Sequence, residues 1–307
     1  MRKIVYSLSI LAMAGMIASC DGGEKIKTVA EMEGELYAPG QETVYIDVPE
    51  SVLFETDTVP EYTIINNPQV NLDAFPVDKD GYIILFDGSC IKGWRGYNKD
   101  EVPGKWSIEI DSVLSVGCLK FSGTGGGEAQ EKDGGDLIFA HKFKNFELSI
   151  DWKVSKGANS GIFYLAQEIK DQHIYISSPE SQVLDNENHV DAKMGEDGNR
   201  MSSSLYDMIP AKPQNAKPFG EWNNTTITVF KGTVLHAQNG KNVLEYHLWT
   251  PEWEKMLINS KFKPGGDFPI AFSLLNNCGG DAREGYIGLQ DHGDDVWFKN
   301  IKIKILD

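Results

Sequence analysis

The sequence contains few cysteines, and none of them has the spacing that metal or redox sites require. Its 307 residues include four, and no two of these form a C-x-x-C pair. Structural zinc sites and thioredoxin-like redox motifs depend on such close pairs, so both are excluded. Apart from Cys20, one disulfide among Cys90, Cys118 and Cys278 could form in an oxidising compartment, and we expect at least one buried free thiol.

The chain is also short of positive charge. It carries 29 Lys and Arg against 45 Asp and Glu, which gives a formal net charge of −16. A surface of this sign repels nucleic acid and anionic lipid headgroups, so we expect neither as a partner.

Long apolar runs are missing as well, with one short exception at the start. Arg2 and Lys3 precede a mostly apolar stretch, residues 4–17, that is too short and wrongly flanked for a membrane span. The Ile17-Ala18-Ser19-Cys20 run then matches a bacterial lipoprotein signal. We therefore predict a signal peptide over residues 1–19 and a lipidated Cys20. The protein would be anchored in the bacterial cell envelope, in the periplasm or at the outer-membrane surface, and would touch the membrane only through its lipid. An ordinary secretory peptide, cut elsewhere, is the alternative.

The composition divides the rest of the chain into two parts. Residues 20–77 are rich in Asp, Glu, Pro and Thr with short apolar pieces, and we interpret them as an acidic spacer that could lie against the main domain. A separate small domain is the alternative. Residues 78–307 have the length of one β-sandwich domain.

Strand patterns dominate this second part. Apolar and polar side chains alternate along residues 146–154, which predicts a strand with one buried face. Further strands are expected at residues 225–230, 233–238 and 242–247, and Asn239-Gly240 is a strong hairpin signal between the last two. Long helical periodicity is absent after the signal peptide. The sequence therefore predicts an all-β sandwich of two antiparallel sheets.

The alternation of apolar residues changes phase within the last expected strand. Val296 and Phe298 alternate on one face, whereas Ile301, Ile303 and Ile305 fall on the other. A β-bulge near residue 300, or burial on both faces, would resolve it.

The segment Pro179-Glu180-Ser181-Gln182-Val183-Leu184-Asp185 carries the sharpest chemical signal. In a strand, Glu180 and Gln182 point to the same face. A carboxylate and an amide on one sheet face suit sugar hydroxyls, because the first accepts and the second both donates and accepts hydrogen bonds. The carboxylate could also remove a proton. The plain alternative is a solvated strand face.

Other candidates stand at turns and strand ends. Asn159 follows a Gly-rich turn and could bind a hydroxyl, or serve only the turn. Gln290 and His292 follow an apolar run, where binding groups often gather. Trp222 is either a core residue or a platform for a sugar ring. None of the histidines has close ligand spacing.

Two apparent motifs are rejected. The Gly-rich residues 123–128 lack the strand-to-helix context of phosphate loops. Residues 185–196 imitate a calcium loop, but Val190 stands where its sharp turn demands glycine. No cofactor is certain, although a divalent metal, calcium or a transition ion, is possible.

Several pieces, in order, resemble the 3-keto-disaccharide hydrolase domain family. They are Leu85-Phe86-Asp87-Gly88, Gly93-Trp94, Phe146-Glu147-Leu148, Asn159-Ser160-Gly161-Ile162, the 180–185 segment, Glu221-Trp222-Asn223, Asn239-Gly240, the run from Gly285 to Gly293, and Phe298-Lys299-Asn300-Ile301. The resemblance implies a concanavalin-A-like jelly roll, secreted or lipidated, that acts on oxidised disaccharides. Many members have an arginine shortly after the Asn-Ser-Gly strand. Leu165 and Ala166 stand there instead, so this contact departs from the family pattern.

The resemblance and the residues together give a candidate site. We expect Glu180 and His292 to be catalytic, and substrate contacts from Asn159, Tyr164, Gln182, Asp185, Tyr206, Trp222 and Gln290. A ketone at C3 acidifies the proton at C2, so Glu180 or His292 could remove it and the C1 group would leave by β-elimination. Gln182, His292 or a metal would stabilise the enolate. Hydration would complete net hydrolysis of a disaccharide or oligosaccharide.

Other functions stay open from the sequence. Hydrolysis by two carboxylates is the alternative chemistry, but the 180–185 strand carries only one carboxylate on its face. A non-catalytic glycan-binding lipoprotein would use the same groups. A protein-interaction or adhesion module would instead show an exposed apolar patch.

Overall fold

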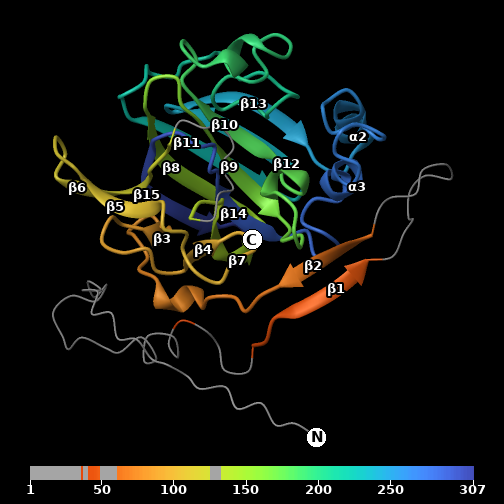
Figure 1. Cartoon of the computed structure of the whole chain (residues 1–307), viewed down its shortest axis with the longest axis horizontal. Coiled ribbons are helices and arrows are strands. Elements are labelled where there is room, and N and C mark those ends of the chain that lie inside the picture. Colours follow the sequence, from red (N-terminus) through yellow and green to blue (C-terminus); the bar gives the residue numbers. More distant parts are fainter. Residues whose placement is uncertain (1–35, 37–40, 49–60, 125–132) are drawn as a thin grey trace, which may run out of the picture.

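The computed structural model describes residues 36, 41–48, 61–124 and 133–307, and its regular secondary structure is mostly antiparallel β-sheet (Figure 1). A five-stranded sheet has the order β10 (Glu180–Leu184), β9 (Asn159–Ala166), β14 (Gly285–Leu289), β7 (Leu137–Phe143), β4 (Trp94–Gly96). An eight-stranded sheet has the order β13 (Lys241–His247), β12 (Thr233–Gln238), β11 (Asn223–Phe230), β8 (Phe146–Val154), β15 (Val296–Ile305), β6 (Val116–Phe121), β5 (Trp106–Asp111), with β3 (Ile83–Phe86) paired to β15. One hydrophobic core joins the two sheets. The predicted all-β sandwich of two antiparallel sheets is confirmed.

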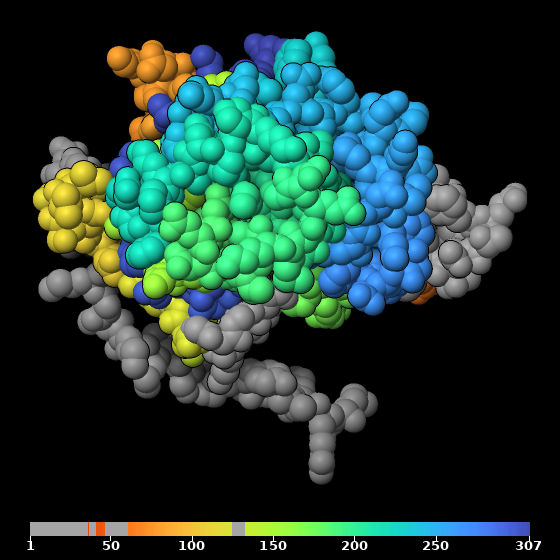
Figure 2. Space-filling view, turned by 90° about the horizontal axis from the view of Figure 1, so that it is seen from above, coloured from red at the N-terminus to blue at the C-terminus, as the bar shows by residue number. Residues whose placement is uncertain are grey.

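Helical structure is limited to short pieces. Two α-helices, α2 (Pro251–Ile258) and α3 (Ala271–Asn276), lie at one end of the sandwich (Figure 1). Three 3-10 turns complete the described part: η1 (Leu72–Ala74), η2 (Ile174–Ile176) and η3 (Val190–Lys193). The space-filling view shows the blue surface of the α2–α3 region against the green surface of the loops that follow β10 (Figure 2).

The alternation predicted for residues 146–154 is confirmed in β8. Phe146, Leu148, Ile150, Trp152 and Val154 are buried, and the residues between them are half-buried. Strand β9 behaves differently, because all eight of its residues are buried. The five-stranded sheet is therefore covered on both faces along this strand, and alternation alone does not tell its inner face from its outer one.

The conflict of phase in β15 is resolved by a bulge. The register with β8 shifts between Lys299 and Lys302, and Asn300 takes a left-handed conformation with φ of 49°. The extra residue returns Ile301 and Ile303 to the buried face that Val296 and Phe298 occupy.

Residues before the main domain take part in its packing. Strands β1 (Val44–Val48) and β2 (Tyr62–Asn66) form a hairpin, and Ile64 also bridges to Ile169. Val70 and Phe75 are buried in the core of the sandwich. The second half of the predicted spacer therefore lies against the domain.

A buried ion pair lies where this extension meets the sandwich. The guanidinium of Arg95 donates two hydrogen bonds to Glu168, from Nη1 to Oε1 at 2.7 Å and from Nη2 to Oε2 at 2.6 Å. The side chain of Glu168 is fully buried. It also accepts from the backbone N–H of Asn98 and from Nδ2 of Asn67.

The thiols that the structure describes are in the expected state. Cys118 and Cys278 are both free and buried, so no disulfide joins them to each other or to Cys90. No helix among the described residues is long and apolar enough to cross a membrane. Residues 1–35 lie outside the described part of the chain, so the signal peptide and the lipidation of Cys20 stay predictions.

Candidate functional site

The outer face of the five-stranded sheet carries the polar residues predicted from the 180–185 segment. Val183 and Ile162 point into the core between the sheets. By strand alternation, Glu180 and Gln182 point the other way. The register then sets Gln182 opposite Gly161 on the neighbouring strand, β9.

Gly161 makes room for the carboxylate of Glu180. An ideal Cβ built on Gly161 would lie only 2.3 Å from Glu180 Oε1, so the carboxylate occupies the space that any other residue would fill. Glu180 is 6% exposed, which means that its carboxylate is held close against the sheet.

Tyr206 flanks Glu180 on the open side of β10. The Tyr206 N–H donates to the Glu180 carbonyl at 3.1 Å, and Leu205 bridges to Ser181. Tyr206 is therefore the cross-strand neighbour of Glu180 on the outer face. Burial, followed by the negative charge of Glu180, raises the pKa of Tyr206, which keeps the phenol protonated. Its hydroxyl donates to Asp191 at 2.9 Å.

Three buried polar atoms on this face have no hydrogen-bond partner within the described residues. They are Oδ1 of Asn159, Nε2 of Gln182 and Oε1 of Gln290. A buried polar atom left unpaired costs about 1–3 kcal/mol, so natural proteins seldom leave several together. Two acceptors and one donor, gathered near a carboxylate, suit a ligand that offers several hydroxyls and one acceptor oxygen.

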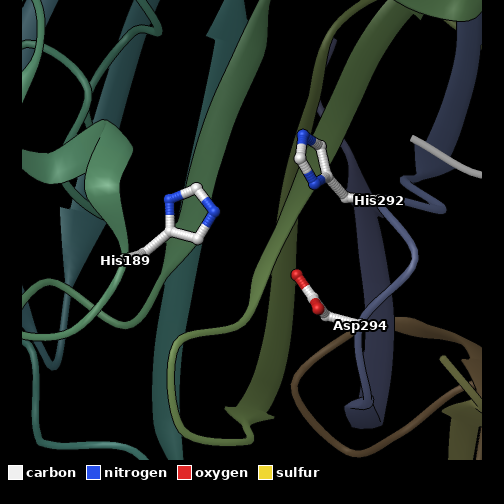
Figure 3. Close-up of side chains that lie close together, drawn as sticks. All are labelled: His189, His292 and Asp294. Atoms are coloured by element: carbon white, nitrogen blue, oxygen red, sulfur yellow. The ribbon is translucent and has the colours of Figure 1, made fainter. Parts of the chain in front are cut away.

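Beside Asn159, three side chains converge from two segments, the start of η3 and the turn between β14 and β15 (Figure 3). His189, His292 and Asp294 are half-buried, and one ligand atom from each lies within 4.8 Å of the others. Asn159 connects the group to the sheet. Its backbone N–H donates to Asp294 Oδ2 at 3.1 Å, and its Nδ2 lies 3.3 Å from His292 Nε2.

Backbone contacts position each member of this cluster. His189 caps η3, where its Nδ1 accepts the N–H of Asp191 at 3.1 Å. The turn with His292 is fixed by Asp291, whose carboxylate accepts from Gly293 N at 3.0 Å and from Gly135 N at 2.7 Å.

Two imidazoles and one carboxylate form a donor set that suits a divalent transition ion. Imidazole nitrogen is a good ligand for Zn, Fe, Ni and Cu, whereas calcium prefers oxygen ligands throughout. Of the two kinds of ion considered from the sequence, the donors favour the transition metal.

Three of the residues expected to contact substrate make structural contacts instead. Tyr164 points into the core, where its hydroxyl lies 2.8 Å from His236 Nε2 and 2.5 Å from the Tyr246 hydroxyl. Tyr164 and its neighbour Phe163 point to opposite faces of β9, and Tyr164 lies on the inner face. This position is not compatible with a contact to substrate. Burial lowers the pKa of His236 to about 4, so this core histidine is neutral.

Asp185 and Trp222 are likewise occupied by structural contacts. The carboxylate of Asp185 accepts from Gly157 N at 2.7 Å and from Asn188 Nδ2 at 2.8 Å, and it thereby joins two turns. Trp222 donates to Asp111 at 3.1 Å, and Lys153 lies 4.8 Å from its ring centroid. That places it over the eight-stranded sheet rather than beside Glu180, because Lys153 is a half-buried, outward-facing residue of β8.

The sequence reasoning did not find His189 and Asp294 as partners of His292. The His292-x-Asp294 spacing on a polar turn was an available signal, since a turn can present both side chains to one point. His189 stands more than 100 residues earlier and had no such signal.

Comparisons with known proteins show the family to which this chain belongs. Residues 81–304 match the family model described as "3-keto-alpha-glucoside-1,2-lyase-like domain". A curated protein of Bacteroides thetaiotaomicron, named "3-keto-disaccharide hydrolase", is 55% identical over 317 aligned positions that cover all of both chains. A crystal structure of "a putative glycosyl hydrolase" from Parabacteroides distasonis ATCC 8503 aligns with a TM-score of 0.60 and 26% identity, over 84% of this chain and 100% of the other. The family expected from the residue pattern is confirmed, and the chain belongs to the 3-keto-alpha-glucoside-1,2-lyase-like domain family.

Proposed function

We propose that this protein cleaves the glycosidic bond of 3-keto-disaccharides by β-elimination, with Glu180 as the base. Membership of the family supports an enzyme acting on carbohydrates, and the 55% identical relative carries the name of a 3-keto-disaccharide hydrolase. The observation that carries the proposal is the carboxylate of Glu180, held over Gly161 beside three unpaired polar atoms.

The chemistry follows from the ketone. A carbonyl at C3 makes the C2 proton acidic, so a carboxylate within reach can remove it. The electron pair then forms the C2–C3 enolate, and on its return it forms the C1–C2 double bond as the C1–O bond breaks. The departing sugar takes up a proton, and addition of water to the unsaturated product completes net hydrolysis.

The groups next to Glu180 suit the charges that develop during this reaction. The Nε2 of Gln182 has N–H donors to offer to an enolate oxygen, which stabilises the charge as it develops. The unpaired oxygens of Asn159 and Gln290 can accept hydrogen bonds from sugar hydroxyls. The substrate would thus pair with atoms that have no hydrogen-bond partner in the described part of the chain.

A divalent transition ion, held by His189, His292 and Asp294, is part of the proposal. When bound, such an ion would act as a Lewis acid on the C3 carbonyl oxygen and would favour the enolate. Within the protein, Asn159 holds Asp294 and His292 in place for it. The N–H of Asp191 donates to Nδ1 of His189, and this hydrogen bond fixes the orientation of the ring beside the other two residues of the cluster.

The decisive test is product release from a 3-keto-disaccharide and from its unoxidised parent. Protein lacking residues 1–20 would be assayed after treatment with a chelator and again with added Co²⁺ or Zn²⁺. Cleavage of the keto sugar alone is expected. Cleavage of both sugars would indicate a two-carboxylate glycosidase, and binding of the disaccharide without cleavage would indicate a glycan-binding protein.

Loss of a metal ligand is expected to abolish tight metal binding. His292→Ala should lower Co²⁺ affinity by at least about tenfold, since a ligand is removed from a three-ligand set. Isothermal titration calorimetry measures this directly. His247→Ala is the matched control, because His247 is exposed at the edge of the eight-stranded sheet and lies outside the cluster. Equal affinities of His292→Ala and the wild type would exclude the cluster as the metal site.

Gly161→Ala is expected to lower kcat by about 100-fold without unfolding the protein, since displacements near 1 Å can cost that much. The new Cβ would contact the end of the flexible Glu180 side chain, which must move away from the sheet. Initial rates and Tm together check this. Gly104→Ala is the control, since a Cβ there comes no closer than 4.0 Å to any neighbour. Wild-type activity in Gly161→Ala would show that the observed carboxylate position is not required.

A further inference from the structure

A lysine surrounded by aromatic rings lies next to the candidate site. The Nζ of Lys261 is 4.4 Å from the ring centroid of Tyr206 and 5.3 Å from that of Tyr175. It is also 5.1 Å from the ring of Phe262 and 5.6 Å from that of Phe268. Tyr175 and Phe268 pack edge to face with centroids 5.6 Å apart, so the rings form one connected cluster.

The backbone of Lys261 is fixed, but its ammonium is uncommitted. The Lys261 N–H donates to Asp207 Oδ2 at 2.8 Å, while Arg200 binds the other oxygen of Asp207. Within the described residues, Lys261 Nζ has no hydrogen bond or ion pair. Aromatic faces attract a cation without consuming its N–H groups, so three donors stay available to a ligand.

The position of Lys261 links its ammonium to the proposed reaction site. Tyr206, under Lys261, is the cross-strand neighbour of Glu180 on the outer face. Tyr175 belongs to η2, and the adjacent Ile174 packs with Phe163 on the same face of the sheet. In the space-filling view, the blue surface of the α2–α3 region and the green surface after β10 meet without an intervening segment (Figure 2).

The keto sugar has one position fixed by its reaction. Its C2 proton must face Glu180, so this ring lies over Gly161 and Gln182. A second ring can then extend beyond Glu180 toward Tyr206. There it would meet the half-exposed rings of Tyr175 and Phe268, which suit the C–H faces of a sugar, and the donors of Lys261, which suit its oxygens.

We propose that Lys261, with Tyr175 and Phe268, binds the departing sugar of the disaccharide. This inference rests on the proposed function, because it takes the orientation of the substrate from the position of Glu180. These three residues would recognise the second ring of the substrate and would take no part in proton removal.

The test compares two substrates with the same keto ring. One is a 3-keto-disaccharide, and the other is the methyl 3-keto-glucoside, which lacks the second ring. Lys261→Met keeps most of the apolar stem of the side chain and removes its charge and donors. We expect kcat/KM for the disaccharide to fall by about tenfold or more, as for a lost charged hydrogen bond. The value for the methyl glycoside should change less than about twofold.

Two variants make the comparison specific. Lys263→Met removes an exposed lysine two residues away and should leave both substrates unaffected. Lys261→Arg keeps charge and donors and should retain more disaccharide activity than Lys261→Met. Equal losses on both substrates, or none on either, would overturn the proposal.

A binding measurement tests the sugar contact of Lys261 independently of catalysis. If the wild type cleaves neither keto substrate, the proposed function fails, and calorimetry with the intact disaccharide still tests the subsite. Weaker binding by Lys261→Met than by Lys263→Met would support it. Equal binding by the two variants, or no binding by the wild type, would overturn it.

Discussion

Replacing Glu180 with glutamine is expected to lower kcat on a 3-keto-disaccharide by about 10³-fold, within the range for loss of a general base. Glutamine has nearly the same shape, so it fills the space over Gly161, but its amide does not accept the C2 proton. KM should change little, because the unpaired groups of Asn159, Gln182 and Gln290 stay in place. Initial rates of product release measure the effect, and exchange of the C2 proton with deuterated solvent should stop as well.

Glu196→Gln is the matched control for this substitution. Glu196 is exposed on the loop after η3, so its neutralisation changes the net charge equally and should leave the rate unaffected. If Glu180→Gln retained more than half of the wild-type rate and still exchanged the C2 proton, the base would be another group. His292 would then be the next residue to replace.

Replacing Arg95 with methionine is expected to lower the free energy of unfolding by about 3–5 kcal/mol. The carboxylate of Glu168 is fully buried, and without the guanidinium it would keep only the N–H of Asn98 and the amide of Asn67. A buried charge without its counter-ion is costly, because water does not reach it. Urea denaturation followed by tryptophan fluorescence measures the change.

Two further variants distinguish burial from ion pairing as such. Lys302→Met breaks the partly exposed pair with Asp78 and should cost no more than about 1 kcal/mol. The double variant Arg95→Met with Glu168→Met should recover much of the stability, because it removes both buried charges. Equal small losses for Arg95→Met and Lys302→Met would contradict the assignment of a strong buried pair.

The sequence predicted those parts of the fold that depend on local patterns. The alternation along β8 gave its buried face, and Asn239-Gly240 gave a hairpin in which both residues have positive φ. The bulge at Asn300 was one of two predictions made from the change of phase in the apolar pattern of β15. Each of these features is decided by residues within about ten positions of one another.

The site depended more on distant contacts. Glu180 and Gln182 share a face because they stand two apart in a strand. Tyr164 was placed on that face too, because both faces of β9 are buried and the alternation gave no way to tell them apart. The grouping of His189 with Asp294, and that of Lys261 with Tyr206, bring together segments separated by more than 50 residues. No local pattern encodes such pairs.

The hairpin of β1 and β2 has a mechanical consequence. Val44 pairs with Asn66, so the strand ends that lead to the N-terminal side and to the sandwich lie at the same end of the hairpin. A pulling force applied before Val44 would open the hydrogen bonds of this ladder one after another, and each contributes only about 1 kcal/mol. Meanwhile Ile65 and Thr63 hold β2 against Glu168 and Lys170. The hairpin would therefore yield by unzipping before the load reached the sheet that carries Glu180.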